Sequence, residues 1–305
     1  MPVSGVSRPY PSEAEAVLGL CGPLAAGVPE WRRRAGSVRH SREALVRQRV
    51  FQIACGYEDQ NDADTLRADP LLKLVCGRLP ETGTDLASQP TLSRLENAVR
   101  ATSCYRLAWA LGHVYLRERE RLAGERGEPG GVPRRLLLDL DGTDDPTHGR
   151  QEGTAYHGYY RQHMYFPLLL FDGDTDQLIT AVLRPGNAHG SHGVVAVLKR
   201  VVRGVRARWP GVPIELRADS GFAVPALYAW CEAEGIGYTI GLIPNSRLEA
   251  AAAPLLAAAH QQHATPARSA GWPERRPTGP RAGPVPGGWS TRRRPWPTAP
   301  TPAWH

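Results

Sequence analysis

The sequence predicts an α/β protein with a mixed β-sheet, and three changes of pattern along its 305 residues support this fold class. Residues 1–128 carry apolar side chains at helical spacing, residues 129–262 alternate short apolar runs with helical segments, and residues 263–305 show no hydrophobic period. The middle region reads strand, hairpin, helix, strand, helix, strand, an order typical of an α/β domain with a mixed sheet. We therefore expect a helical N-terminal region, an α/β domain and a disordered tail.

Apolar residues three and four positions apart predict helices in the N-terminal region. One stretch is 41–57, and another is 91–121, where Ser93 and Glu96 have the spacing of a capping box. The apolar stripes of the two stretches consist of Leu45, Val46, Val50, Ile53, Ala54, Leu95, Val99, Leu107, Leu111 and Val114. Two interpretations stay open: a helical subdomain without chemistry, and a DNA-binding module. Glycine and proline at 124–133 predict a linker after this region.

Short apolar runs predict the strands of the middle region, and they lie at 135–141, 164–172, 177–184, 213–219 and 238–242. The turn-rich sequence between the second and third of these runs predicts a hairpin. Helices are expected at 192–209 and at 223–234, the latter ended by Gly235. An alanine-rich helix at 247–263 follows the last strand.

Composition argues against several classes of protein. No window holds the ~20 uninterrupted apolar residues that a membrane span needs, and the first residues lack the apolar core of a signal peptide. The five cysteines are scattered and form no C-x-x-C pair, which argues against a disulfide framework and a cysteine zinc site. This usage fits a reducing cytoplasm, with each cysteine acting as a small buried apolar residue.

Most of the positive charge belongs to the tail. Residues 264–305 contain seven arginines and one glutamate, so they account for all but one unit of the net charge of +7. The charge by itself therefore does not indicate DNA binding by the folded part. The same residues hold 10 of the 28 prolines, which prevents a packed core. An arginine-rich arm for nucleic acid is one interpretation; the composition favours the product of a frameshift in a GC-rich gene.

Carboxylates close two of the predicted strands. Asp139 and Asp141 lie two residues apart, so both point to one face of the first strand, and Asp219 ends another strand. Carboxylates at adjacent strand ends, without a histidine or cysteine cage, suit a hard cation such as Mg²⁺. Two such ions can clamp the attacking and leaving oxygens of a phosphoryl transfer. Asp219 before Ser220-Gly221 is equally explained as a helix N-cap.

The sequence DLDGT at 139–143 also matches the first motif of haloacid-dehalogenase-like phosphohydrolases. In that interpretation Asp139 is the nucleophile and Asp141 the general acid and base. The motif lies in mid-chain, however, and Lys199 is the only lysine after it. The interpretation stays open as an alternative.

A polar turn follows the hairpin. Arg184, Asn187 and His189 lie in the sequence LRPGNAHGSHG, directly after a predicted strand. Guanidinium and amide groups there could contact phosphate, although the pattern is not specific.

Five ordered motifs resemble one known family. They are RVFQIACGYEDQNDADTLRADPLLKL from Arg49, LASQPTLSRLEN at 86–97, LDLDGTDDPTHGRQEG at 138–153, LRPGN at 183–187 and RADSGF at 217–222. Together they closely resemble the DDE transposases of bacterial insertion sequences, specifically the insertion sequence 1380 family. The similarity runs from about residue 18 to about residue 260.

The resemblance implies a ribonuclease-H-like core whose first and second metal-binding acids are Asp141 and Asp219, with Asp139 less favoured as the first. It implies Mg²⁺ or Mn²⁺ as cofactor and hydrolysis at the transposon ends. The freed 3′ hydroxyl then attacks target DNA, so the implied partners are double-stranded DNA at the ends and at the target. Transposases commonly work as dimers, which implies a homodimer in the cytoplasm, associated with the nucleoid.

One part of the family pattern is missing. The third acid of the family is a downstream glutamate on a helix, after a tyrosine and an arginine and before a lysine. Glu249 comes too early in the chain, and Glu274 stands among prolines. We therefore expect a C-terminally truncated or frameshifted transposase that is inactive. The alternative is a remnant that binds transposon-end DNA without cutting it.

Overall fold

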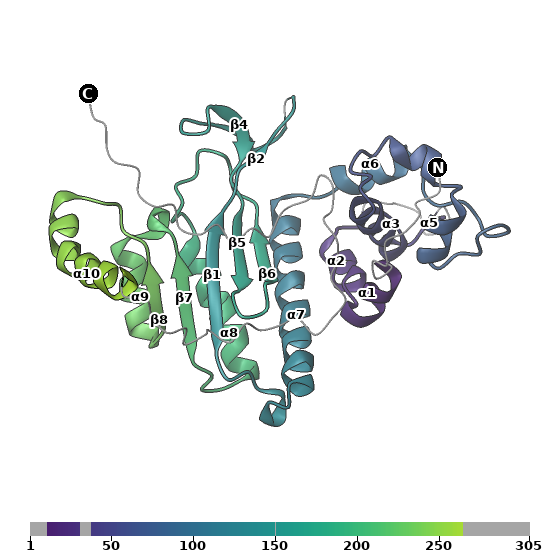
Figure 1. Ribbon diagram of the computed structural model, residues 1–305. Helices are drawn as coiled ribbons and strands as arrows, with labels where there is room; N and C mark the ends of the chain where they lie inside the picture. Colours follow the sequence, from purple (N-terminus) through teal and green to yellow (C-terminus); the bar gives the residue numbers. More distant parts are fainter. Residues whose placement is uncertain (1–10, 31–37, 150, 265–305) are drawn as a thin grey trace. The chain divides into compact units, whose positions relative to one another are not determined.

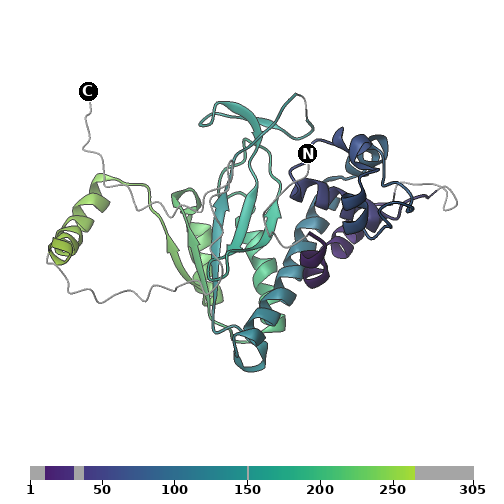
Figure 2. The same cartoon turned by 45° about the vertical axis from the view of Figure 1, so that its right-hand side comes forward.

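The computed structural model describes residues 11–30, 38–149 and 151–264. The chain divides between Ile243 and Pro244 into two compact units. The first unit holds the N-terminal helices and the sheet (Figures 1 and 2). The second holds α10 (Ser246–Ala264), which confirms the alanine-rich helix. Of the predicted disordered tail, all but residues 263 and 264 lies outside the described residues.

Seven α-helices are described before the sheet begins, and they are α1 (Pro11–Leu18), α2 (Cys21–Gly27), α3 (Arg42–Ala54), α4 (Asp62–Leu66), α5 (Pro70–Val75), α6 (Gln89–Asn97) and α7 (Ala101–Glu125). Helix α3 confirms the helix predicted at 41–57, but its predicted apolar stripe is wrong at Ile53 and Ala54, which are exposed because the buried face turns to Phe51 and Gln52. Its first turn is capped by the Ser41 hydroxyl, which accepts from the Ala44 N–H at 3.1 Å. Leu45 and Val46 are buried with Leu92 and Leu95 in one apolar cluster. No helix in the described ranges is both long and apolar enough to cross a bilayer.

The capping box expected at Ser93 and Glu96 is wrong. Helix α6 begins at Gln89, with Pro90 in its first turn, so Ser93 lies in the helix interior and accepts from the Asn97 side chain. Glu96 instead pairs with Arg49 of α3 at 2.5 Å. The predicted stretch 91–121 forms two helices, since helical structure stops at the end of α6 and begins again at Ala101 in α7.

Five strands form the main sheet, in the order β6-β5-β1-β7-β8. They are β1 (Leu136–Gly142), β5 (Leu168–Asp172), β6 (Gln177–Val182), β7 (Ile214–Ala218) and β8 (Gly237–Ile240). Strand β5 is antiparallel to both β1 and β6, whereas β7 is parallel to β1 and to β8. This mixed sheet, with β1 at its centre and β7 as its fourth strand, confirms the ribonuclease-H-like fold class.

One predicted strand is two. The run 164–172 divides into β4 (Gln162–Tyr165) and β5, because Phe166 and Pro167 interrupt it and proline has no N–H for a ladder. Strand β4 belongs to a second sheet of order β2-β4-β3, with β2 (Asp145–Pro146) and β3 (Ala155–His157). This small sheet lies beyond the end of β1 that carries Gly142 (Figure 1).

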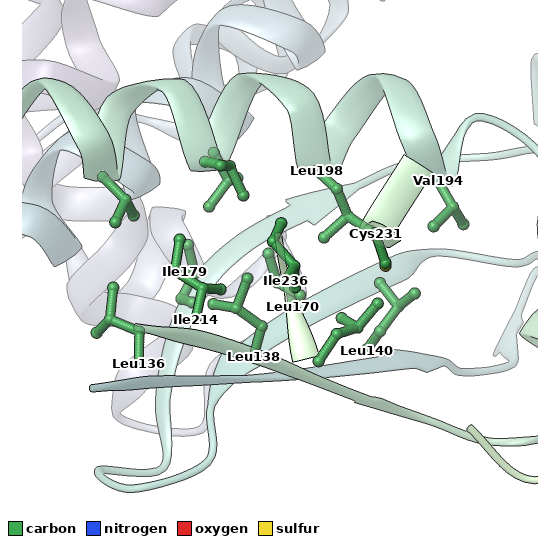
Figure 3. Close-up of a cluster of buried hydrophobic side chains, with 14 of the residues drawn as sticks. Leu136, Leu138, Leu140, Leu170, Ile179, Val194, Leu198, Ile214, Cys231 and Ile236 are labelled. Atoms are coloured by element: carbon green, nitrogen blue, oxygen red, sulfur yellow. The ribbon is translucent and has the colours of Figure 1, made fainter. Parts of the chain in front are cut away.

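The main core lies between the sheet and helices α8 (Val194–Arg208) and α9 (Pro225–Glu234). Figure 3 shows the apolar side chains of β1 beneath α8. Alternation in the strand sends Leu136, Leu138 and Leu140 to this face, and leaves the aspartates between and after them on the other. Helix α9 ends at Gly235, whose φ of 64° suits glycine.

Helix α7 belongs to two apolar clusters. Leu107 packs with the N-terminal helices, close to Gly27 of α2, while Tyr115 and Trp109 pack with the sheet core. The Thr180 hydroxyl of β6 also donates to the Ala108 carbonyl at 2.7 Å. A single helix thus lines the edge of the sheet and supports the N-terminal helices.

All five cysteines are described and free. Cys21 and Cys231 are buried, as predicted, and burial raises the pKa of the Cys231 thiol to about 11. Cys55 is exposed, so the prediction of a buried residue is wrong there, since it follows the last turn of α3.

Candidate functional site

Asp141 and Asp219 lie at the ends of neighbouring parallel strands. Leu140 of β1 pairs in register with Ala218 of β7, and each is followed directly by its aspartate. Both aspartates are exposed. The Asp141 carboxylate accepts from the Gly142 N–H at 2.8 Å, and the Asp219 carboxylate accepts from the Gly221 N–H at 2.8 Å. The second bond caps the short helix η3 (Ser220–Phe222), which confirms the N-cap interpretation of Asp219.

Negative charge is concentrated at this point. Although solvent reaches Asp141, its pKa is raised, first because the surrounding protein reduces the hydration of the carboxyl group. The hydrogen bond from the Gly142 N–H lowers the pKa, and the negative charges of Asp219 and Asp139 raise it further. A raised pKa means that ionised Asp141 costs the fold free energy at neutral pH. A bound cation would relieve that repulsion.

Asp139 is engaged elsewhere. Its Oδ1 accepts from Arg217 Nε at 2.5 Å, and its Oδ2 accepts from the Nη2 of the same guanidinium. A Cβ added at Gly173 would lie 2.6 Å from Asp139 Oδ2 and 2.8 Å from Arg217 Nη2, so a glycine leaves room for the pair. Asp139, the nucleophile in the phosphohydrolase interpretation, is therefore held by two hydrogen bonds to Arg217. It does not stand at the strand end with Asp219, as Asp141 does.

The LRPGN motif and the loop that follows it pack next to the turn after Asp219. Arg184 is only 5% exposed, and its guanidinium donates to the carbonyls of Phe166, Gly190 and His192. Burial lowers the pKa of Arg184. A Cβ at Gly190 would lie 3.0 Å from the Gly221 carbonyl, so this loop packs against the turn after Asp219. The Arg184 guanidinium thus bonds to backbone carbonyls of the surrounding loop, and the phosphate contact considered for this motif stays a prediction.

Sequence reasoning missed an aromatic group beside the acids. Phe166 contacts Gly142, with 2.9 Å from its ring to the position of an added Cβ. His157 lies 5.4 Å from Phe166 and 4.9 Å from Tyr160, between ring centroids. Burial and the charges of Asp144, Tyr159, Asp141 and Asp219 raise the pKa of Tyr160. The available signal was three tyrosines within residues 156–160 of a chain that has ten.

The third acid is not assigned within the described ranges, where no group of three or more histidine, cysteine, aspartate or glutamate side chains could hold a metal ion. Glu249 lies in the first turn of α10, and Glu274 lies outside those ranges.

Comparisons with solved structures give low similarity. The piggyBac transposase synaptic complex with hairpin DNA matches with 16% identity and a TM-score of 0.35, covering 75% of this chain and 52% of that one. The chain thus spans about half the length of that transposase. The Mos1 transposase paired-end complex with left transposon end matches with 12% identity and a TM-score of 0.25, over 76% and 78% of the two chains. The Mos1 strand transfer complex matches with 12% identity and a TM-score of 0.22, over 85% of each.

The family comparison is more extensive. No curated protein matches the chain. Residues 12–285, which include β1, β7 and both aspartates, match the family described as Transposase DDE domain group 1. With nearly the whole sequence matched, the chain belongs to the group 1 family of DDE transposase domains.

Proposed function

We propose that this chain is the DNA transposase of a bacterial insertion sequence of the insertion sequence 1380 family. It would bind double-stranded DNA at the transposon ends, cleave a strand there and transfer it to target DNA. The observation that carries the proposal is the meeting of Asp141 and Asp219 at the ends of paired parallel strands. Family membership supports the reaction class. A homodimer on paired ends, in the cytoplasm at the nucleoid, belongs to the same proposal.

The two aspartates suit Mg²⁺ or Mn²⁺. Carboxylate oxygens are the ligands these hard cations prefer, and Asp141 already experiences the repulsion of Asp219 that a cation would remove. When bound, the metal supplies stabilisation of charge on the reacting phosphate. The chain orients both carboxylates through the N–H groups of Gly142 and Gly221. Asp141 and Asp219 are the residues that would hold the cation.

We further propose that the 305-residue polypeptide by itself does not catalyse DNA cleavage. Two carboxylates bind a hard cation less tightly than three, and the described residues bring together only Asp141 and Asp219 as acids of this site. DNA binding needs neither of them. Binding without cleavage is therefore the expected behaviour of the isolated polypeptide.

A DNA assay tests the binding and the inactivity. The probe is a genomic fragment that carries the encoding gene and its flanks, incubated with the full chain in Mg²⁺. We expect binding whose affinity falls steeply with salt, as counterion release requires, and nicking no faster than with Asp219→Asn. Nicking that disappears in Asp219→Asn would contradict the inactivity and support a live enzyme. Absence of salt-dependent binding would contradict the DNA partner.

A metal titration tests the two acids directly. Mn²⁺ at ten times its dissociation constant should stabilise the fold by about 1.4 kcal/mol, measured as a rise in Tm. Asp219→Asn should remove this rise. Without metal it should melt at a slightly higher temperature than the wild type, because asparagine still accepts from the Gly221 N–H but no longer repels Asp141. Asp176→Asn, in the exposed turn between β5 and β6, is the matched control and should keep the Mn²⁺ response. An unchanged response in Asp219→Asn would exclude this residue as a ligand.

A further inference from the structure

The tip of the hairpin formed by β3 and β4 carries aromatic rings that the proposed cleavage does not use. Tyr159 is 83% exposed and Tyr160 is 39% exposed. Their rings lie edge to face with centroids 5.1 Å apart, and Tyr160 rests on His157. Tyrosines this accessible contribute little to a hydrophobic core, so their role has to be sought at the surface.

The tip has a defined backbone conformation. The Arg161 N–H donates to the His157 carbonyl at 2.8 Å, and the Tyr160 N–H donates to His157 Nδ1 at 3.3 Å. Arg161 has a φ of 54°, a left-handed conformation that is rare for a residue with a side chain. Arg161 is exposed and directly follows the two tyrosines in the sequence. The hairpin thus presents two aromatic rings and one cation from an already closed turn.

The tip is placed beside the acids. His157 and Tyr160 both lie near Phe166, at 5.4 and 6.4 Å between ring centroids, and Phe166 contacts Gly142, the residue after Asp141. Burial raises the pKa of Tyr160, and the negative charges of Asp141 and Asp219 add to this. Tyr156, on the same hairpin, alternates to the other face and stacks edge-on against His163.

We propose that Tyr159 and Tyr160 form a stacking platform for the unpaired bases of a single DNA strand next to the phosphate held at Asp141 and Asp219, with Arg161 contacting the strand's backbone. Every base has a face that stacks on an aromatic ring, and a guanidinium neutralises a phosphate. Where one strand separates from the duplex next to the reacting phosphate, its unpaired bases are free to stack in this way. The proposal deepens the proposed function and rests on it for the position of the phosphate.

Anisotropy titrations of the full chain test this without metal or turnover. The three probes are labelled oligothymidine of about 20 nucleotides, a fork with one such arm, and a blunt duplex of the fork's paired part. Tyr159→Ala should weaken binding of the fork and of oligothymidine at least about fivefold, and should leave the blunt duplex unchanged. Tyr159→Phe keeps the ring and should bind like the wild type. Tyr156→Ala, at 53% exposure on the opposite face, is the matched control and should not change affinity.

Arg161→Asn separates charge from stacking. Asparagine tolerates the left-handed conformation, so the turn should persist, and the loss of one phosphate contact should reduce the salt slope of fork binding by about one. Fork affinity of Tyr159→Ala within twofold of the wild type, or an equal loss in Tyr156→Ala, would overturn the platform.

The two proposals fail in different ways. A platform that survives while Asp219→Asn leaves the Mn²⁺ response intact would mean that the acids are misassigned. Loss of the platform with a normal metal response would leave the proposed function standing.

Discussion

Asp172→Asn is expected to lower the free energy of unfolding by about 3 kcal/mol, because it leaves the buried guanidinium of Arg119 without its carboxylate. The side chains of Arg119 and Asp172 are 3% and 0% exposed, with 3.1 Å between Arg119 Nε and Asp172 Oδ2. The Tyr115 hydroxyl donates to the same oxygen at 2.9 Å, and burial together with Asp172 raises the pKa of Tyr115, which keeps it a donor. Urea unfolding followed by tryptophan fluorescence measures the change.

The control is the double variant Asp172→Asn with Arg119→Met. Removing both charges takes away the uncompensated guanidinium, so at least half of the lost stability should return. Tyr115→Phe removes one hydrogen bond and should cost about 1 kcal/mol. A single Asp172→Asn variant as stable as the wild type would show that Glu128, 3.6 Å from Arg119, is a sufficient partner.

Gly186→Ala should detach the small sheet from the main one. An added Cβ would press against the carbonyl oxygen of Met164 and lie 2.5 Å from that of Ala155, and both are backbone atoms of paired strands. Overpacking of this kind costs about 3 kcal/mol when the neighbours cannot move. We expect faster hydrogen exchange over residues 155–165 and earlier tryptic cleavage after Arg161.

Gly158→Ala provides the comparison within the same hairpin. No atom lies within 4 Å of an added Cβ at Gly158, so stability should change by less than about 0.5 kcal/mol. If Gly186→Ala protects residues 155–165 as well as the wild type does, the LRPGN motif does not hold the hairpin to the sheet.

The strands of the main sheet could be predicted because their apolar runs are long enough to show. The leucines at 136–138 form a continuous apolar run that predicts a buried strand, and Leu138 and Leu140 then alternate with the two aspartates, which indicates the face that packs on the core. The small sheet could not be predicted in this way, since β2 has two residues and β3 has three. Pro167 marks the end of strand β4 in the sequence, but the apolar residues on both sides of it look like one continuous strand.

The pairing of Asp141 with Asp219 was also within reach of the sequence, since the carboxyl ends of parallel strands meet at one edge. The ion pair between Asp139 and Arg217 is harder to predict, because it depends on the register of two strands. A signal did exist: Asp139 and Arg217 stand at the same offset, two residues before the two acids, and the register places them opposite each other. The contacts of Phe166 with Gly142 and His157 join residues far apart in sequence, and no periodicity reports such contacts.

The shared position of α7 has a consequence for how this unit loses its structure. With 25 residues the helix is about 37 Å long, and Leu107 and Tyr115 lie in different apolar clusters on that one rod. Fraying that begins among the N-terminal helices removes support from β6, and melting of the sheet removes support from α2. Helices and sheet are therefore thermodynamically coupled, and a force on the N-terminal helices is transmitted along a continuous backbone to the edge of the sheet.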